Sequence, residues 1–220
     1  MKKNCILESV MQFELFDSQT NNILSQTSYK EFAEALRHSN CRKCALSESR
    51  TNIVVDRGNP SSKILVVGEA PGQNEDLQGK AFVGKAGKLF DQIMLSIGLD
   101  TNRDMLICNV AKCRPPENRA PRQEEAQSCL PFLTRQISLV QPKIILLLGA
   151  TALKYFDLKK KNFSMESQAG NFFRLDEFPN ISFMVLYHPA ALLYNAKLKS
   201  AMWEHVKTLK KFLENDKASG

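Results

Sequence analysis

The segment from Lys63 to Met94 constrains the fold of this chain most strongly, because a buried-strand pattern runs directly into a glycine-rich loop and then into a helical pattern. Four successive apolar residues, Ile64 to Val67, predict a strand that ends at Gly68. Pro71 and a series of glycines follow, so we expect no regular element before Ala86. A parallel sheet presents a ligand site in this order of strand, loop and helix.

Three later segments repeat the buried-strand pattern and alternate with helical patterns: Met105 to Val110, Lys143 to Leu148, and Ser182 to Leu186. This alternation predicts a three-layer α/β/α fold with a central four-stranded parallel sheet. The carboxyl ends of parallel strands meet at one edge of the sheet. We therefore expect the functional residues there.

Helical signals complete this pattern. Ser28 and Glu31 form a predicted capping box that opens a helix before the first cysteine pair. Pro131 is expected to kink or break the helix that precedes the third strand. Apolar stripes at helical spacing predict core-facing helices over Leu89 to Ile97 and Leu198 to Leu213.

The chain divides into three parts by composition. Residues 1–26 are rich in Asn, Gln, Ser and Thr and predict a flexible arm, residues 27–214 a folded domain, and residues 215–220 a polar tail. Within the arm, the segment from Gln12 to Phe16 reads QFELF. It resembles the short peptide by which bacterial replication and repair proteins bind the sliding clamp. The alternative is an apolar segment that folds back on the domain.

The balance of 30 Lys and Arg against 23 Asp and Glu gives a formal net charge of +7, which favours a polyanionic partner such as nucleic acid. A basic protein without such a partner is the alternative. The apolar run around Ile144 to Leu148 is much shorter than the ~20 residues that cross a bilayer. No apolar signal core follows Met1, so we expect a cytoplasmic protein with no membrane partner. We also expect it to be a monomer.

Six cysteines in a reducing compartment predict metal ligation or burial rather than disulfides. Cys41 and Cys44 form a CxxC pair, and Cys113 and Cys129 form a second, wider pair. Four thiolates from two segments can bind either zinc or an iron-sulfur cluster, and the wide second pair leans slightly toward the cluster. The two remaining cysteines are not expected to be ligands: Cys5 in the arm, and Cys108 as a buried thiol in a strand.

The glycine-rich loop also resembles a phosphate-binding loop between Gly79 and Ala86. However, Ala86 stands where a Ser or Thr hydroxyl would hold magnesium, and this loop does not leave a strand directly. A nucleotide phosphate site is therefore not expected.

Residues suited to binding a planar base follow the predicted strands. Glu69 follows the first strand, Asn109 ends the second, His188 follows the fourth, and Phe82 lies in the glycine-rich loop. An aromatic face can stack on a base, an amide can read its hydrogen-bonding edge, and an imidazole can support developing charge. Each residue alone could be a cap, a turn former or a core plug. Those roles do not explain why all four are expected at one edge of the sheet.

Four motifs in this order resemble those of the family-four uracil-DNA glycosylases: GEAPGQNE from Gly68, GKAFVGKAG from Gly79, NVAKCRPP from Asn109 and HPAALL from His188. The resemblance covers roughly residues 28 to 213. It implies a four-iron four-sulfur cluster, with zinc as the alternative. It also implies a monofunctional, base-flipping DNA repair enzyme that hydrolyses the N-glycosidic bond of deoxyuridine in single- or double-stranded DNA and leaves an abasic site.

The resemblance also implies roles for individual residues at the base. Phe82 is expected to stack on uracil, Asn109 to read its N3 and O4 edge, and His188 to donate to O2 as charge builds on the leaving base. Gly68 and Ala70 are expected to line the same site.

Two acidic residues are candidates for positioning the attacking water. Glu69 is favoured and Glu75 is second, since a carboxylate near the sugar can stabilise an oxocarbenium-like transition state. First-family glycosylases carry an aspartate where this chain has Ala70. The strength of acid catalysis is therefore left open.

Contacts to DNA are expected from two further segments. Lys112, Arg114 and Arg119 form a basic loop that could contact phosphates, and Leu192 and Tyr194 follow the histidine motif as wedge residues for the base stack. Similar proteins often carry Arg at the position of Tyr194. This difference would exchange phosphate contact for stacking.

Two alternative functions remain open. One is a non-catalytic iron-sulfur DNA-binding module with a glycosylase-like fold. The other is a relative that captures uracil-DNA covalently. Such relatives carry an added histidine after the second strand. The segment from Pro115 to Pro121 has none, which argues against capture.

Overall fold

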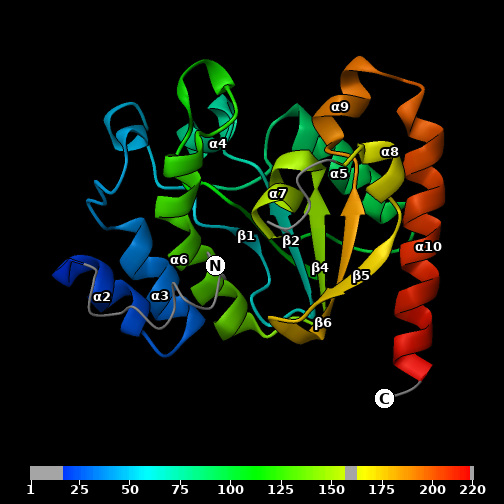
Figure 1. Cartoon of the computed structure of the whole chain (residues 1–220), viewed down its shortest axis with the longest axis horizontal. Coiled ribbons are helices and arrows are strands. Elements are labelled where there is room, and N and C mark those ends of the chain that lie inside the picture. The colour runs from blue at the N-terminus through cyan, green and yellow to red at the C-terminus, as the bar shows by residue number, and fades with distance from the viewer. Residues whose placement is uncertain (1–16, 157–162, 219–220) are drawn as a thin grey trace.

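The computed structural model describes residues 17–156 and 163–218. One sheet with the strand order β1-β3-β2-β4-β6-β5 forms its centre (Figure 1). The inner strands are mutually parallel: β2 (Ile64–Gly68), β3 (Met105–Asn109), β4 (Ile144–Leu148) and β6 (Phe178–Leu186). They correspond to the predicted strands, and the α/β class is confirmed.

The sheet has six strands rather than the predicted four, because a short antiparallel strand lies at each edge. β1 (Arg57–Gly58) pairs with β3, and β5 (Phe172–Leu175) pairs with β6. A two-residue strand is too short to produce a periodic pattern. The turn between β5 and β6 is Asp176-Glu177, which lacks the glycine that usually marks a hairpin in sequence.

Helices cover both faces of the sheet (Figure 1). On one face, Phe90 and Met94 of α5 (Lys85–Leu95) and Val206 of α10 (Leu198–Ala218) pack with Val66 of β2. On the other face, α6 (Gln123–Val140) and α7 (Gly149–Phe156) pack with Leu65 and Val67. Alternate β2 residues thus serve opposite faces, as the period of a strand requires.

A further layer of helices packs on the outer side of α6. Helices α2 (Ser18–Ser25) and α3 (Tyr29–Arg37) contribute Ile23 and Phe32 to a core shared with Phe132 of α6. Ser28 is confirmed as the N-cap, because its Oγ accepts from the Glu31 N–H at 3.2 Å. The Glu31 carboxylate accepts from the Ser28 hydroxyl at 2.8 Å, so the two side chains are linked directly. The arm expected over residues 1–26 is therefore helical and packed in its last part. The clamp-like segment from Gln12 to Phe16 lies outside the described residues.

The predicted absence of a regular element after β2 is wrong, and the predicted alternative of a break at Pro131 is also wrong. The loop after β2 contains α4 (Gln73–Gln78), and the glycines expected to prevent a helix are its ends: Gly72 is the N-cap, and Gly79 is the left-handed C-cap with φ +66°. Helix α6 continues through Pro131, whose neighbours Phe132 and Leu133 are buried on both sides of the helix. Packing outweighs the lost backbone hydrogen bond there.

The short remaining helices lie in loops: η2 (Ala45–Glu48), η3 (Pro116–Asn118), α8 (Met165–Gln168) and α9 (Pro189–Tyr194). No helix within the described ranges is long and apolar enough to cross a membrane.

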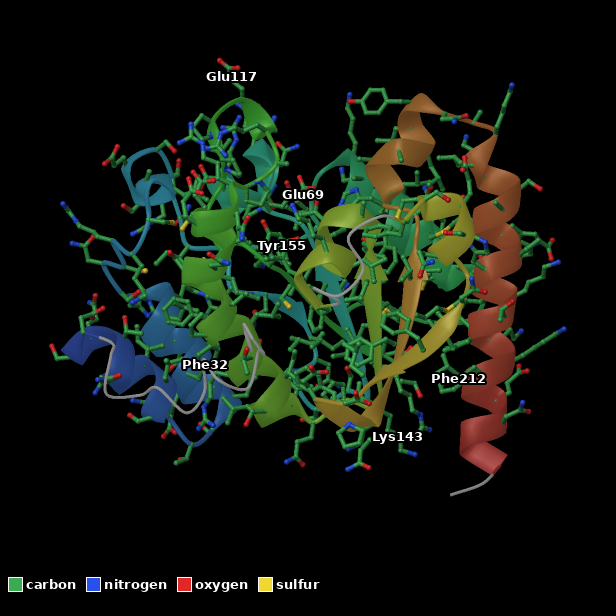
Figure 2. All side chains as sticks on the ribbon, in the orientation of Figure 1. Phe32, Glu69, Glu117, Lys143, Tyr155 and Phe212 are labelled. Carbon is green, nitrogen blue, oxygen red and sulfur yellow. The ribbon has the colours of Figure 1, made fainter. Side chains whose placement is uncertain are left out.

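The two ends of the sheet can be located by labelled residues. Figure 2 labels Glu69, which follows β2, at the carboxyl end of the parallel strands, and Lys143, which precedes β4, at the opposite end.

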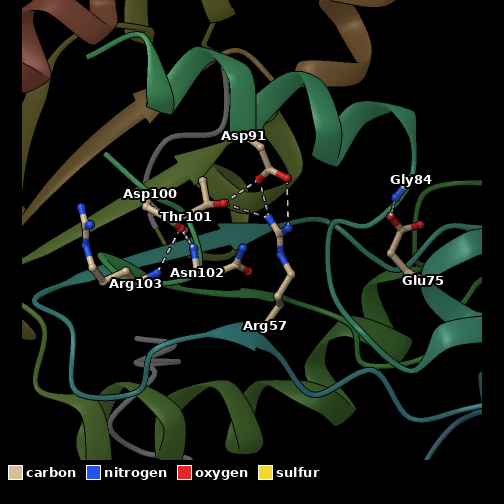
Figure 3. Close-up of polar contacts among 8 residues, drawn as sticks. All are labelled: Arg57, Glu75, Gly84, Asp91, Asp100, Thr101, Asn102 and Arg103. Atoms are coloured by element: carbon tan, nitrogen blue, oxygen red, sulfur yellow. Dashed lines mark hydrogen bonds and ion pairs between the residues drawn. The ribbon is translucent and has the colours of Figure 1, made fainter. Parts of the chain in front are cut away.

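An ion pair joins the edge strand β1 to α5. The guanidinium of Arg57 contacts both carboxylate oxygens of Asp91 at 2.6 and 3.1 Å (Figure 3). Thr101 donates to the same carboxylate at 2.7 Å. This bidentate pair fixes α5, the helix that ends the glycine-rich loop.

Candidate active site

A cavity of about 400 Å³ opens at the carboxyl ends of the parallel strands. A larger hollow of about 690 Å³ lies beside Cys41 and α2, and none of the strand-end residues lines it. Residues from the loops after β2, β3, β4 and β6 line the smaller cavity. The structure brings together there most of the predicted site residues: Glu69, Ala70, Glu75, Phe82, Asn109, Arg119 and His188.

Asn109 is the most unusual polar side chain of this cavity. It is 1% exposed, and neither Oδ1 nor Nδ2 has a hydrogen-bond partner among the described residues. Native proteins rarely leave such a group unpaired, because its desolvation is then uncompensated. The arrangement therefore indicates a ligand that supplies both a donor and an acceptor to this amide.

Phe82 lies against the same wall in a strained backbone conformation with φ +54°. Its ring centroid is 5.7 Å from that of His188. A Cβ added to Gly68 would lie 2.5 Å from Asn109 Oδ1 and 2.6 Å from the Phe82 ring. A Cβ on Gly87 would overlap the Phe82 carbonyl. Gly68 does not itself line the cavity, but its missing side chain lets the amide and the ring approach β2.

His188 begins α9, and its Nδ1 accepts from the Ala190 N–H at 3.2 Å. An imidazole that accepts at Nδ1 carries its neutral-state proton on Nε2. Burial lowers the pKa of His188 to about 4, and the Glu75 carboxylate opposes this shift only partly. The imidazole is therefore neutral near pH 7, with Nε2–H available as a donor.

The two carboxylates predicted at the site have different partners. Glu69 accepts from the hydroxyl of Thr151, a residue of α7 that the sequence analysis did not single out. Glu75 accepts from the Gly84 N–H at 2.6 Å, where α5 begins (Figure 3). Glu75 thus holds the end of the glycine-rich loop. Thr151 could have been found from its position after the third predicted strand.

Two residues expected to contact DNA are buried. Lys112 is 1% exposed, and its ammonium donates to the Asn109 carbonyl at 2.6 Å and to the Gln136 side chain. Leu192 is part of the core, because the helical period of α9 turns it inward. In contrast, Tyr194 is 90% exposed, and Leu193 beside it is also exposed.

Both predicted arginines have partners of their own, and Arg119 also lines the cavity. Both Nη atoms of Arg119 contact the Glu125 carboxylate, at 2.7 and 2.8 Å. Arg114 Nε donates to Asn118 Oδ1 at 2.8 Å. Both side chains are half-buried, so each can still turn part of its guanidinium toward solvent.

The four cysteines predicted as ligands gather in one region. Burial raises the pKa of the Cys129 thiol to about 12, with Cys113 as the next contributor. Burial also raises the pKa of Cys113 to about 11, and Cys44 and Cys41 add to this rise. The thiols are therefore close enough to influence one another, and the donor set is entirely sulfur, which suits an iron-sulfur cluster.

The cysteine region has two further features. Arg50 Nη1 donates to Cys113 Sγ at 3.5 Å, a contact that the sequence analysis missed. Within the described part of the chain, no three His, Cys, Asp or Glu side chains have the close spacing of a single-ion site. Cys108 is fully buried in β3, as predicted.

Comparison with known proteins identifies the family. A family model for the uracil DNA glycosylase superfamily matches residues 55–210. A type-4 uracil-DNA glycosylase of Sulfurisphaera tokodaii is 43% identical over 174 residues, which cover 77% of this chain and 79% of that protein. The corresponding protein of Saccharolobus solfataricus is 41% identical over 179 residues, 80% and 82% of the two chains. That of Archaeoglobus fulgidus is 42% identical over 162 residues, 72% and 81%. The chain therefore belongs to the type-4 uracil-DNA glycosylases of this superfamily.

Proposed function

We propose that this protein is a monofunctional DNA repair glycosylase that hydrolyses the N-glycosidic bond of deoxyuridine, releases uracil and leaves an abasic site. The unpaired, buried amide of Asn109 carries the proposal. Uracil presents an N3–H donor beside its O4 acceptor. Asn109 Oδ1 accepts from N3–H and Nδ2 donates to O4, so binding satisfies two atoms that otherwise have no partner within the described residues.

The base lies between Phe82 and the donor on His188. The Phe82 ring supplies an apolar face for stacking. His188 Nε2–H donates to uracil O2, and this hydrogen bond strengthens as negative charge develops on the leaving base. A neutral donor is favoured because the pKa of His188 is lowered to about 4.

Glu69 is the proposed group for the attacking water. Thr151 orients its carboxylate by donating to one oxygen, and the carboxylate also stabilises positive charge on the sugar. Glu75 lines the same cavity, but its hydrogen bond to the Gly84 N–H supports a role in holding the loop. The C1′–N1 bond breaks and its electrons leave with uracil, while the oxygen of water bonds to C1′ and a proton of that water passes to the Glu69 carboxylate. The released uracil anion takes up a proton from solvent.

Access to the base requires flipping of the nucleotide out of the duplex. The exposed Tyr194 and Leu193 at the end of α9 suit a wedge in the remaining stack. Arg119, which lines the cavity, and the half-buried Arg114 suit phosphate contacts, in keeping with the formal net charge of +7.

We also propose that Cys41, Cys44, Cys113 and Cys129 hold a four-iron four-sulfur cluster, as the family resemblance implies. These four residues would tie the segment before β1 to the loop and helix that follow β3 when the cluster is bound. Visible absorbance and iron content distinguish it from zinc. A colourless protein with stoichiometric zinc would contradict this assignment.

A gel assay tests the glycosylase activity. The protein is incubated with single- and double-stranded oligonucleotides that carry one uracil, and alkali then cleaves abasic sites. We expect cleavage at uracil only after alkali, and none in a matched thymine oligonucleotide. Binding without cleavage at any salt concentration would refute the proposal and favour a non-catalytic module.

A further inference from the structure

Lys112 is a cation in the protein core, where charged groups are rarely found without a charged partner. It is 1% exposed, and both acceptors of its ammonium are neutral: the Asn109 carbonyl at 2.6 Å and Gln136 Oε1. The hydrolysis described above does not use this side chain. A fully buried lysine is rare, so the place of this side chain calls for an explanation.

A chain of hydrogen bonds orients the second acceptor of Lys112. The Gln136 Nε2 group donates to the Tyr29 hydroxyl at 2.9 Å and to the Val55 carbonyl at 3.2 Å. The Tyr29 hydroxyl in turn donates to Asp56 Oδ2 at 2.8 Å. Because the amide nitrogen of Gln136 is engaged, its oxygen must face Lys112. The hydrogen bond to Gln136 thus holds the ammonium in place, and its other hydrogen bond goes to the Asn109 carbonyl.

The contact lies where β3 ends and regular pairing stops. The antiparallel pairing of β1 with β3 covers only Leu106 and Ile107, and the parallel pairing with β2 ends at Asn109. Beyond it, the chain bends through Val110 and Ala111 before it reaches Lys112. The N–H of the same peptide, that of Val110, donates to the Gly68 carbonyl at 2.9 Å. The bond from Lys112 to the Asn109 carbonyl is therefore the second hydrogen bond on this peptide, and the two together hold the residue that carries the reading amide.

We propose that Lys112 is a positioning residue that holds the Asn109 peptide, and through it the Asn109 side chain, in the orientation that reads uracil. This inference rests on the proposed function of Asn109. The ammonium acts on the main chain behind the base site and does not contact DNA.

A double-mutant comparison tests the proposal. Four proteins are purified with their absorbance spectra and unfolding midpoints recorded: wild type, Lys112→Met, Asn109→Ala and the double variant. Lys112→Met is expected to slow single-turnover excision by about 10- to 100-fold, as small misplacements at active sites do. Because Lys112 acts through Asn109, the double variant should be no more than about 3-fold slower than Asn109→Ala. Independent, multiplied losses would overturn the proposal.

Two controls separate positioning from folding. Leu133→Ala removes a buried side chain of α6 that does not line the cavity, and it should lower the unfolding midpoint while keeping the single-turnover rate. Tyr29→Phe removes the hydroxyl that accepts from Gln136 and donates to Asp56, so Gln136 is held less firmly toward Lys112. This variant tests the inference even if Lys112→Met does not fold. It should slow excision by about 2- to 5-fold, and this loss should vanish in the Asn109→Ala background.

A measurement without substrate distinguishes failure of this inference from failure of the proposed function. The side-chain amide resonance of Asn109 in ¹⁵N-labelled protein is assigned by its loss in Asn109→Ala. It should shift or broaden in Lys112→Met, or in Tyr29→Phe where Lys112→Met does not fold, and stay unchanged in Leu133→Ala. An unchanged resonance would refute the role of Lys112, whereas absent uracil excision by the wild type would refute the function alone.

Discussion

Asn109 and Asp76 are both buried polar side chains beside the glycine-rich loop, but they are satisfied in opposite ways. Asp76 is 2% exposed, and its carboxylate accepts from the Thr51 N–H at 2.9 and 3.0 Å and from the Asn52 N–H at 3.1 Å. Asn109 is 1% exposed and has no side-chain partner among the described residues. The first side chain fastens α4 to the segment that follows the CxxC pair. The second keeps its hydrogen-bonding capacity for a ligand.

The same contrast separates other pairs in the site. The Glu75 carboxylate is bound to a backbone N–H, whereas the Glu69 carboxylate is bound, among the described residues, to a side-chain hydroxyl. His188 combines both roles, because Nδ1 caps a helix while Nε2 remains for the base. Groups bonded to the backbone are expected to govern stability, and the remaining groups are expected to govern chemistry.

Asn109→Leu gives the largest expected effect on activity. Excision should fall on the order of 100- to 1000-fold, because the reading hydrogen bonds are lost. The free energy of unfolding should stay equal or rise, since an apolar side chain of similar size replaces an unpaired amide. Single-turnover assays and urea unfolding measure both, with Met105→Leu in the same strand as the control. A variant that loses stability and keeps activity would reverse the assignment.

Exchanging the two carboxylates for amides sharpens the contrast further. Glu69→Gln should slow excision by about 100-fold with an unchanged unfolding midpoint, because it loses a proton-accepting group near the sugar. Glu75→Gln should slow excision less and lower the midpoint more, since a neutral amide binds the Gly84 N–H more weakly. Excision rates and thermal unfolding of both variants provide the comparison. Similar losses of activity in both would show that the loop contact does not divide their roles.

Asp76→Ala should affect stability alone. The Thr51 and Asn52 N–H groups would lose their acceptor in a buried position, so unfolding should become easier by about 2 to 4 kcal/mol. Excision well below the unfolding midpoint should remain within about 3-fold of wild type. Urea unfolding with a parallel excision assay tests this. Full stability in this variant would remove the basis of the comparison.

His188 predicts a smaller, pH-dependent effect. The pKa of the folded state is about 4, below the ordinary value of 6.5, so the unfolded chain binds the proton more readily. Stability from the neutral ring is therefore complete above about pH 6.5 and decreases as the pH falls toward 4, by about 3 kcal/mol. His188→Gln should lose this part of the pH dependence. Equal slopes for the two proteins between pH 7 and 4.5 would contradict the shift.

The base site could be largely predicted from sequence, because topology brings the ends of parallel strands together. Asn109, Phe82 and His188 meet for that reason. Lys112 was misjudged because a charge in a loop usually indicates solvent, whereas its burial depends on Gln136 of a distant helix. Leu192 was predicted as a wedge residue but is buried, because the face of α9 that turns inward depends on packing against the rest of the fold.

Glycines and prolines were the least reliable signals. Gly72 and Gly79 predicted an irregular loop, but a six-residue helix fits between them because both residues are caps. Pro131 predicted a break, but the packing of α6 keeps the helix continuous. Local propensity identifies residues that can end an element. It does not reveal when tertiary contacts override them.

The missing side chain at Gly68 also limits how this enzyme can evolve. A single methyl group there would overlap both Asn109 and Phe82, so the smallest mutation available to this codon would obstruct two parts of the base site at once. A compensating change would have to shrink one of two residues that the reaction needs. We therefore expect any substitution at position 68 to displace the reading amide or the stacking ring, and changes of base specificity to be easier at the other walls of the cavity.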